Sequence, residues 1–438
     1  MTMDMMARDT LATGNDGAKR PFRLRDYTPL TPDNFKELTR PLPRAVRRAL
    51  GFVIGLKQGT LAITLPTGER FRIEGRIKEP VADLEIRSYA FLGNVIKHGD
   101  IGVAESFMAG HWTSSDVTQF LELFCYNEQI IHERIDGNPV ARVLLRFKHW
   151  LHRNTRRQAR RNISAHYDLG NGFYQEWLDP SMTYSSALYQ TGANDLESAQ
   201  RAKYAALADA TGVAAGDHVL EIGCGWGGFA EFLAKERGAF VTGLTISQEQ
   251  FDYATARMER NGLSDQVDIV FQDYRDEKGM YDRIVSVEMF EAVGEAYWPA
   301  YYETLKKHLK PSGKAGLQII TIQDRFFEHY RRATDFIQHY VFPGGMLPTP
   351  DHLRSLGKDA GLVLEEELIF GRDYARTLRE WRDRFQSQWD VIAPMGFDEH
   401  FHRLWRYYLH YCEAGFLAGN IDVRQVVYAH ADDESGKS

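Results

Sequence analysis

Residues 218–228 read HVLEIGCGWGG, an apolar strand pattern that ends in a glycine-rich turn. The helical pattern FAEFLAKERG follows at once. Glycines in such a turn let the backbone approach a ligand closely, and the start of the helix favours negative charge. The spacing of Glu221, Gly223 and Gly225 favours an S-adenosylmethionine loop over a dinucleotide fold or a P-loop, although such turns also occur for packing alone.

Strand and helix patterns alternate from residue 201 onward. Helical patterns separate five strand patterns, at residues 218–225, 240–247, 267–274, 281–290 and 314–323. Such alternation predicts an α/β fold in which helices cover both faces of a doubly wound parallel sheet. Ligands are then expected at the carboxyl ends of the strands.

Candidate cofactor contacts follow the next two strands. The second strand ends without the acidic residue that a dinucleotide fold usually places there, so we expect a ribose contact from Thr245, Gln250 or a neighbour. The third strand ends at Asp273, whose carboxylate is expected to meet the adenine amino group. Tyr274 is expected to pack beside the ring.

The chain outside this sheet has a simple predicted organisation. Residues 1–20 lack sustained apolar periodicity and are predicted to be disordered, and residues 431–438 form a polar tail. Residues 21–140 predict a small α+β domain, because two alternating strands flank a Pro-Thr-Gly turn within residues 59–75 and helical patterns follow.

A basic connector is predicted at residues 141–162. Eight Lys and Arg residues and no acidic residue lie here, interleaved with leucine, phenylalanine and tryptophan. The pattern indicates an amphipathic helix or linker. Two interpretations stay open. One is docking on anionic lipid headgroups, worth about 1 kcal/mol per basic residue; the other is packing against the protein itself.

The composition excludes several classes of protein. Hydrophobic residues make up 43% of the chain, too many for a disordered protein, and a net charge of −7 argues against a nucleic-acid binder. Three scattered cysteines predict neither disulfides nor a metal site, so a reducing compartment is expected. No stretch reaches the about 18 apolar residues that span a bilayer. We therefore expect a cytoplasmic protein, peripheral to the inner face of the membrane.

Colinear motifs beyond the glycine turn resemble those of one enzyme family. They are ESFMAGHW at 105–112, AHYDLGN at 165–171, LDPSMTYSSALY at 178–189, VSVEMFEAVG at 285–294 and YYLHYCEAGF at 407–416, with others between. Together they resemble the cyclopropane fatty acid synthase family, which includes the mycolic acid cyclopropane synthases. The resemblance implies a Rossmann-like class I methyltransferase domain over residues 163–430, in which the inserts after residue 324 form a lipid pocket.

The same resemblance implies a reaction. The sulfonium methyl group of S-adenosylmethionine would be transferred to the cis double bond of an unsaturated acyl chain in a phospholipid, at an anionic membrane surface and in a possible homodimer. An alkene is a poor nucleophile, so the site has to align it in a dry pocket and shelter a carbocation. Aromatic faces stabilise such a cation. The candidates are Tyr184, Phe290, Trp298 and Tyr374, although core packing is the commoner role of each.

Cofactor and bicarbonate contacts carry over by position. The family's cofactor contacts fall on Tyr184, Ser185, Gly223, Gly225, Thr245, Gln250, Tyr274 and Arg275. In the family a bound bicarbonate takes the proton from the transferred methyl group. Its ligands match Ser186, Glu291, Ile320, Ile322 and Tyr374.

The bicarbonate positions depart from the family pattern. Ser186 stands where the family has cysteine, while Ile320 and Ala292 each stand where it has histidine. Ile320 offers no polar group, so that wall becomes apolar. Glu291 is then the expected general base or organiser of an anion site, and a purely structural carboxylate is the alternative.

These departures leave the product open. Proton loss from the new methyl group gives a cyclopropane, whereas loss from a chain carbon gives a methyl-branched or methylene olefin, a possible precursor of furan fatty acids. A lipid-binding protein without catalysis and a methyltransferase for a soluble small molecule are further alternatives.

Two other groups could carry chemistry. Cys412 matches a cysteine that the family has been thought to use in its active site, but alkylation of carbon needs no thiolate, so packing near the lipid channel is favoured. Glu399, His400 and His402 resemble metal ligands, but no further ligand motif accompanies them. A solvated helix face is therefore the expected role, with no metal.

Overall fold

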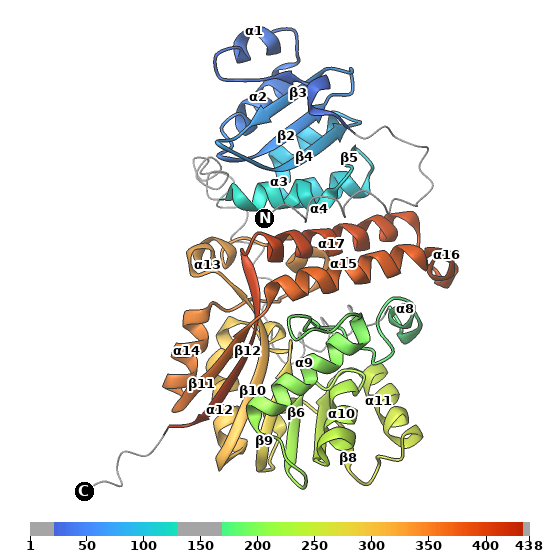
Figure 1. Cartoon of the computed structure of the whole chain (residues 1–438), viewed down its shortest axis with the longest axis vertical. Helices are drawn as coiled ribbons and strands as arrows, with labels where there is room; N and C mark the ends of the chain where they lie inside the picture. Colours follow the sequence, from blue (N-terminus) through green and yellow to red (C-terminus); the bar gives the residue numbers. More distant parts are fainter. Residues whose placement is uncertain (1–21, 129–168, 432–438) are drawn as a thin grey trace, which may run out of the picture.

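The strand patterns after residue 218 form one seven-stranded sheet in a computed structural model that describes residues 22–128 and 169–431 (Figure 1). Its order is β11-β12-β10-β9-β6-β7-β8. The strands are β6 (His218–Ile222), β7 (Phe240–Thr245), β8 (Val267–Phe271), β9 (Tyr281–Val287), β10 (Leu309–Ile322), β11 (Leu362–Ile369) and β12 (Ile421–His430).

The sheet is parallel from β10 to β8, as the alternation predicts, but one edge differs. Strand β12 is antiparallel to both β10 and β11. The chain leaves β11 at the carboxyl edge, forms the helices α15 (Gly371–Ser387), α16 (Trp389–Ile392) and α17 (Glu399–Leu417) there, and returns into the sheet from the same edge. A strand that enters from this edge has to run against its neighbours.

Helices cover both faces of this sheet. They are α9 (Leu196–Thr211), α10 (Gly228–Arg237), α11 (Gln248–Arg260), α12 (Trp298–His308) and α14 (Pro350–Asp359). Successive strand residues enter different cores, because side chains alternate across a strand. Val219 and Val285 pack in the core of α9, α10 and α11, whereas Leu220 and Ile284 pack in the core of α12 and α14.

A smaller five-stranded sheet forms the N-terminal body, in the order β1-β3-β2-β4-β5. The strands are β1 (Thr28–Pro29), β2 (Gln58–Thr64), β3 (Arg70–Glu74), β4 (Ile77–Ile86) and β5 (Trp112–Thr113); the helices are α1 (Phe35–Thr39), α2 (Arg44–Val53), α3 (Ala90–Met108) and α4 (Val117–Tyr126). The antiparallel pairing of β2 with β3 confirms the predicted hairpin.

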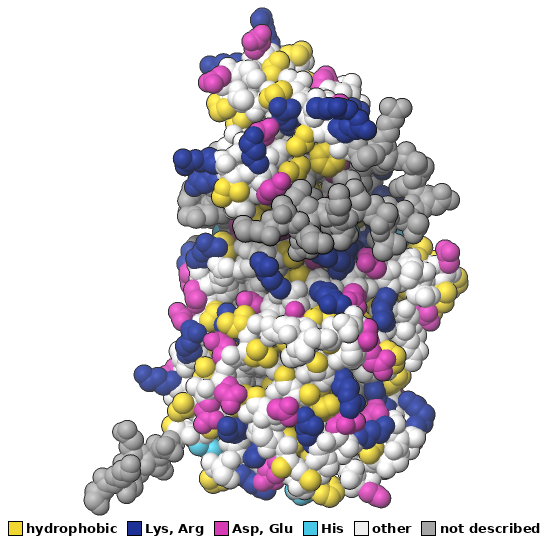
Figure 2. Space-filling view, viewed as in Figure 1, with side chains coloured by type: hydrophobic (Ala, Val, Ile, Leu, Met, Phe, Trp, Pro, Cys, Tyr) yellow, Lys and Arg dark blue, Asp and Glu magenta, His cyan; other side chains and the backbone are white. Residues whose placement is uncertain are grey.

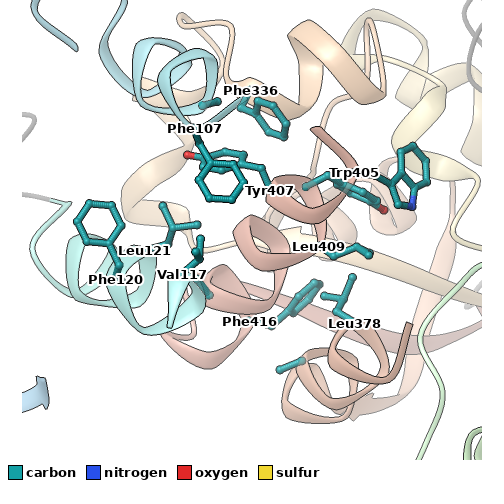
Figure 3. Packing of buried hydrophobic residues seen from close by; sticks show 14 of the residues in the cluster. Phe107, Val117, Phe120, Leu121, Phe336, Leu378, Trp405, Tyr407, Leu409 and Phe416 are labelled. Carbon is teal, nitrogen blue, oxygen red and sulfur yellow. The ribbon is translucent and has the colours of Figure 1, made fainter. Parts of the chain in front are cut away.

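Helices α15 and α17 lie between the two sheets (Figure 1). One buried apolar cluster joins α3 and α4 to α17, and Figure 3 shows Phe107 and Leu121 facing Tyr407. The ring centroids of Phe107 and Tyr407 are 5.5 Å apart. The N-terminal body therefore shares a core with the larger one.

Several predicted segments lie outside the described residues: the disordered stretch 1–20, the connector 141–162 and, apart from Ala431, the tail 431–438. The helical pattern after residue 324 forms α13 (Asp324–Tyr330) and a π-helical turn (Ile337–Val341). Within residues 22–128 and 169–431, no helix is long and apolar enough to cross a membrane.

Candidate functional site

A single cavity of about 1900 Å³ joins the carboxyl edge of the large sheet to the N-terminal body. Its lining starts at the turn after β6 and passes Glu291 and Tyr374. It ends among apolar side chains of the small body such as Leu61, Leu84 and Phe91. The glycine turn and an apolar chamber are therefore parts of one space.

The cofactor residues predicted from sequence all line this cavity. They are Tyr184, Ser185, Glu221, Gly223, Gly225, Thr245, Gln250, Asp273, Tyr274 and Arg275. The structure brings them together because the turns after β6, β7 and β8 meet at one edge of the sheet.

Glycine is required in the turn after β6. Gly223 has a φ of +82°, and a Cβ atom there would lie 2.8 Å from Cγ of Met289. Gly225 has a φ of +54°. Backbone of this kind suits glycine, and it leaves the turn open toward a ligand. The helix α10 begins directly behind it, at Gly228.

Polar groups around the turn fit a charged, hydrogen-bonding cofactor. Glu221 is buried, and its Oε2 atom has no hydrogen-bond partner among the described residues. Burial raises the pKa of Glu221 to about 8, although the charge of Lys203 opposes the shift. Thr245 donates a hydrogen bond to Gln250 (2.9 Å). An unsatisfied carboxyl oxygen beside an open backbone turn is a site for a donor such as an amino group.

One predicted cofactor contact is already paired within the protein. The Asp273 carboxylate accepts hydrogen bonds from Nε and Nη2 of Arg275, at 2.8 and 2.6 Å. The guanidinium lies 5.6 Å from the ring centre of Tyr274. The three residues thus form one structured corner at the end of β8.

Glu291, the predicted general base, lies in the cavity wall beyond the turn. Its Oε1 accepts the N–H of Ile320 at 2.5 Å, and its Oε2 has no hydrogen-bond partner among the described residues. Burial, together with the nearby charge of Glu288, raises the pKa of Glu291 to about 8. Glu291 therefore keeps its proton at neutral pH.

Ser186 differs from the other candidate catalytic residues. Tyr374 and Cys412 line the cavity, but Ser186 does not. The Ser186 hydroxyl donates to the carbonyl of Ala187 at 3.0 Å, and the side chain is fully buried. What Ser186 offers to the site is its backbone N–H.

Sequence reasoning missed Glu288, a carboxylate in the cavity wall that accepts three hydrogen bonds. Its Oε1 accepts the N–H of Ser186 (2.9 Å) and the side-chain amide of Gln318 (2.8 Å), and its Oε2 accepts the hydroxyl of Tyr374 (2.6 Å). Glu288 also has a φ of +50°. The signal was an additional acidic residue in VSVEMFEAVG, three positions before Glu291.

The four aromatic candidates divide into two pairs. Tyr184 and Tyr374 line the cavity. Phe290 and Trp298 do not, since they stack on each other (5.6 Å between ring centroids) in the buried core beside α12. The expectation that all four could face a cation is therefore wrong for the second pair.

The remaining candidates are the Cys412 thiol and the group around His402. Burial raises the pKa of the Cys412 thiol far above its ordinary value, so the residue is a neutral thiol in the cavity wall. His402 pairs with Glu399 (3.2 Å) and stacks on Trp389 (4.1 Å), and only 15% of its side chain is exposed, so the expected solvated face is wrong for this residue. In the described parts of the chain, no group of three or more His, Cys, Asp or Glu side chains could hold a metal ion.

Comparisons with known proteins place this site in context. The tuberculostearic acid methyltransferase UfaA1 of Mycobacterium tuberculosis is 39% identical over 358 residues, which cover 77% of this chain and 81% of the relative. The cyclopropane-fatty-acyl-phospholipid synthase of Escherichia coli K12 is 35% identical over 351 residues, which cover 80% of this chain and 88% of the relative.

A solved structure shares the fold. The crystal structure of the mycolic acid cyclopropane synthase CmaA1, complexed with SAH and CTAB, superposes with a TM-score of 0.58 at 27% identity, over 61% of this chain and 97% of that one. The large sheet is thus a Rossmann-like class I methyltransferase fold. Residues 154–426 match the family described as mycolic acid cyclopropane synthetase. The chain therefore belongs to this family and is an S-adenosylmethionine-dependent methyltransferase that modifies fatty acids.

Proposed function

We propose that this enzyme transfers the methyl group of S-adenosylmethionine to the cis double bond of an unsaturated acyl chain in a membrane phospholipid. The observation that carries the proposal is the continuity of the cavity from the glycine turn to the apolar chamber. Ordinary small-molecule sites have volumes of roughly 300–1,000 Å³. A cavity of about 1900 Å³ has room for a nucleoside cofactor and a long chain together.

The cavity walls suit a reaction through a carbocation. S-adenosylmethionine supplies an electrophilic methyl group, and the chain has to hold the alkene against it in the absence of water. Apolar walls around Ile320 and Phe342 exclude water, and the face of Tyr184 can stabilise positive charge. Tyr184 is held in place by a hydrogen bond between its hydroxyl and that of Tyr408 (2.8 Å).

The mouth of the cavity suits a phospholipid headgroup. Residues that line the cavity and are also exposed to solvent mark this mouth, and they include the basic Arg48, Lys97 and Arg325 beside the acidic Asp100 and Glu328. Ile96, beside Lys97, is 60% exposed. The face in Figure 2 also mixes basic and acidic side chains over both bodies. We therefore propose that peripheral contact with anionic lipid is made at the mouth, where cations and an exposed apolar side chain lie together.

Incubation with methyl-labelled S-adenosylmethionine and vesicles of a monounsaturated phospholipid tests the proposal. NMR of the recovered acyl chains should show the labelled carbon bonded to the former alkene carbons. It should appear either as the ring carbon of a cyclopropane or as the branch of an olefin. NMR is needed because a cyclopropane and its methylene isomer have the same mass. Transfer to free fatty acid but not to vesicles would contradict the phospholipid assignment, and no transfer to either would contradict the proposed activity.

A further inference from the structure

We propose that Glu288 is the base that takes the proton released after methyl transfer, so that a side-chain carboxylate replaces the bicarbonate ion implied by the family resemblance. The inference rests on the proposed function and deepens it. Its starting point is a cavity-lining carboxylate that receives donors from three separate parts of the chain.

The groups expected to hold a bicarbonate ion are engaged within the protein. The N–H of Ser186 and the hydroxyl of Tyr374 both bind the Glu288 carboxylate. The N–H of Ile320 binds Glu291, and the N–H of Ile322 donates to the carbonyl of Pro348 at 3.0 Å. An anion that entered this corner would have to displace Glu288 from its donors.

The backbone directs the Glu288 side chain into the cavity. Glu288 follows the last residue of β9, and its N–H donates to the carbonyl of Gln318 on the neighbouring strand β10 (2.8 Å). Its φ of +50° is unusual for a residue other than glycine. Such strain persists where the surrounding structure imposes it, and it is often found at functional sites.

The two carboxyl groups of this wall have different surroundings. Glu288 receives three hydrogen bonds and lies near the buried Lys203, whereas Glu291 receives the N–H of Ile320. Burial raises the pKa of Glu288, but Tyr374 and Lys203 oppose the shift. Neighbouring carboxylates resist being ionised together. The negative charge therefore belongs on Glu288 and the proton on Glu291, an arrangement typical of a base beside a neutral acid.

The step balances without a further reactant. A bond forms between the sulfonium methyl carbon and one alkene carbon while the methyl–sulfur bond breaks, which leaves S-adenosylhomocysteine and a carbocation. A C–H bond of the cation then breaks, and its electron pair closes the ring or forms a double bond. The proton goes to the Glu288 carboxylate, and exchange with water later restores the base.

Two substitutions at one position test this role. Glu288→Gly removes the carboxylate, relieves the backbone strain and opens space for a small anion; Glu288→Gln keeps the shape but removes the basic oxygen. Both should lower kcat about 100-fold or more in buffer freed of carbon dioxide. Added bicarbonate or formate should restore a measurable part of the activity to Glu288→Gly and none to Glu288→Gln.

The wild-type enzyme and two further variants complete the experiment. Wild-type activity on phospholipid vesicles should not depend on added bicarbonate, Glu291→Gln should lose less activity than Glu288→Gln, and Glu303→Gln, an exposed carboxylate on α12, should match the wild type. Calorimetry should show unchanged S-adenosylmethionine affinity in both Glu288 variants.

The outcomes separate this inference from the proposed function. Strong stimulation of the wild type by bicarbonate, full activity of Glu288→Gly, or rescue of both Glu288 variants alike would overturn the role of Glu288 and leave the methyl transfer intact. No labelled lipid from the wild type would refute the proposed function, and the inference with it.

Discussion

A buried ionic cluster holds the N-terminal body against α17, and its removal should destabilise the protein strongly. Glu413 on α17 has 1% of its side chain exposed and forms ion pairs with Arg379 and with Arg382. The hydroxyl of Thr118 on α4 donates to Glu413 at 2.8 Å and lies 2.7 Å from Nδ1 of His410. Burial and two nearby arginines keep the pKa of His410 well below its ordinary value, so the ring stays neutral.

The magnitude follows from what Glu413→Ala would leave behind. Arg382 is only 13% exposed and would lose its buried counter-ion, for which a cost of about 3–5 kcal/mol in unfolding free energy is expected. Thr118→Val removes the hydrogen bond to the Glu413 carboxylate, together with the contacts of this hydroxyl with Arg382 (3.1 Å) and His410, and should cost about 1.5–3 kcal/mol. The two losses should not add, because both remove the same contact with Glu413.

Urea unfolding, followed by tryptophan fluorescence, measures these changes. Lys78→Ala is the matched control, because its ion pair with Glu74 (3.0 Å) is exposed and should contribute no more than about 1 kcal/mol. A loss for Glu413→Ala as small as that of Lys78→Ala would refute the reasoning. Additive losses in the double variant of Thr118 and Glu413 would refute the shared contact.

Three further predictions concern the cavity. Gly223→Val should abolish S-adenosylmethionine binding in calorimetry, because its side chain would meet Met289, whereas Gly93→Ala, with no atom within 4 Å of the new Cβ, should bind normally. Cys412→Ala should keep kcat within about threefold of the wild-type value, since no thiolate is required. A 100-fold loss of kcat would contradict this prediction and indicate a chemical role for the thiol. Burial raises the pKa of Asp335 to about 7. The free energy of unfolding should therefore fall as pH rises from about 4 to 7, by at most about 1.4 kcal/mol per pH unit. In urea titrations, Asp335→Asn should flatten this dependence.

The local features of the fold could be predicted from sequence because neighbouring residues determine them. The glycine turn after β6 and the hairpin of β2 and β3 depend on backbone conformation and alternation within a few residues. The direction of β12 could not be predicted in this way. It depends on the edge of the sheet at which the preceding helices end, and that edge is not visible in the local sequence. The aromatic residues Phe290 and Trp298 were placed by motif position, which does not reveal the face they occupy.

In the candidate site, too, local features could be predicted from sequence and contacts between distant residues could not. The cofactor residues follow consecutive strands, so the rule for parallel sheets brings them to one edge. The surroundings of Glu288 come from positions far apart in the chain: Ser186 lies 102 residues before it and Tyr374 lies 86 residues after it. A motif comparison with the family could show that histidine and cysteine were lost, but only the folded chain shows which carboxylate meets the remaining donors.

The return of β12 beside β11 makes the helical excursion between them an exchangeable module. Its two ends are adjacent strands, and the N–H of Gly371 at the start of α15 binds the carboxylate of Asp422 at the start of β12 (2.8 Å). Within this excursion, Tyr374 binds Glu288 in the cavity wall, and α17 packs against α3 and α4 of the small body. Transplanting residues 371–420 between members of the family would therefore move Tyr374, Leu378 and the cavity-lining side chains of α17 as one unit.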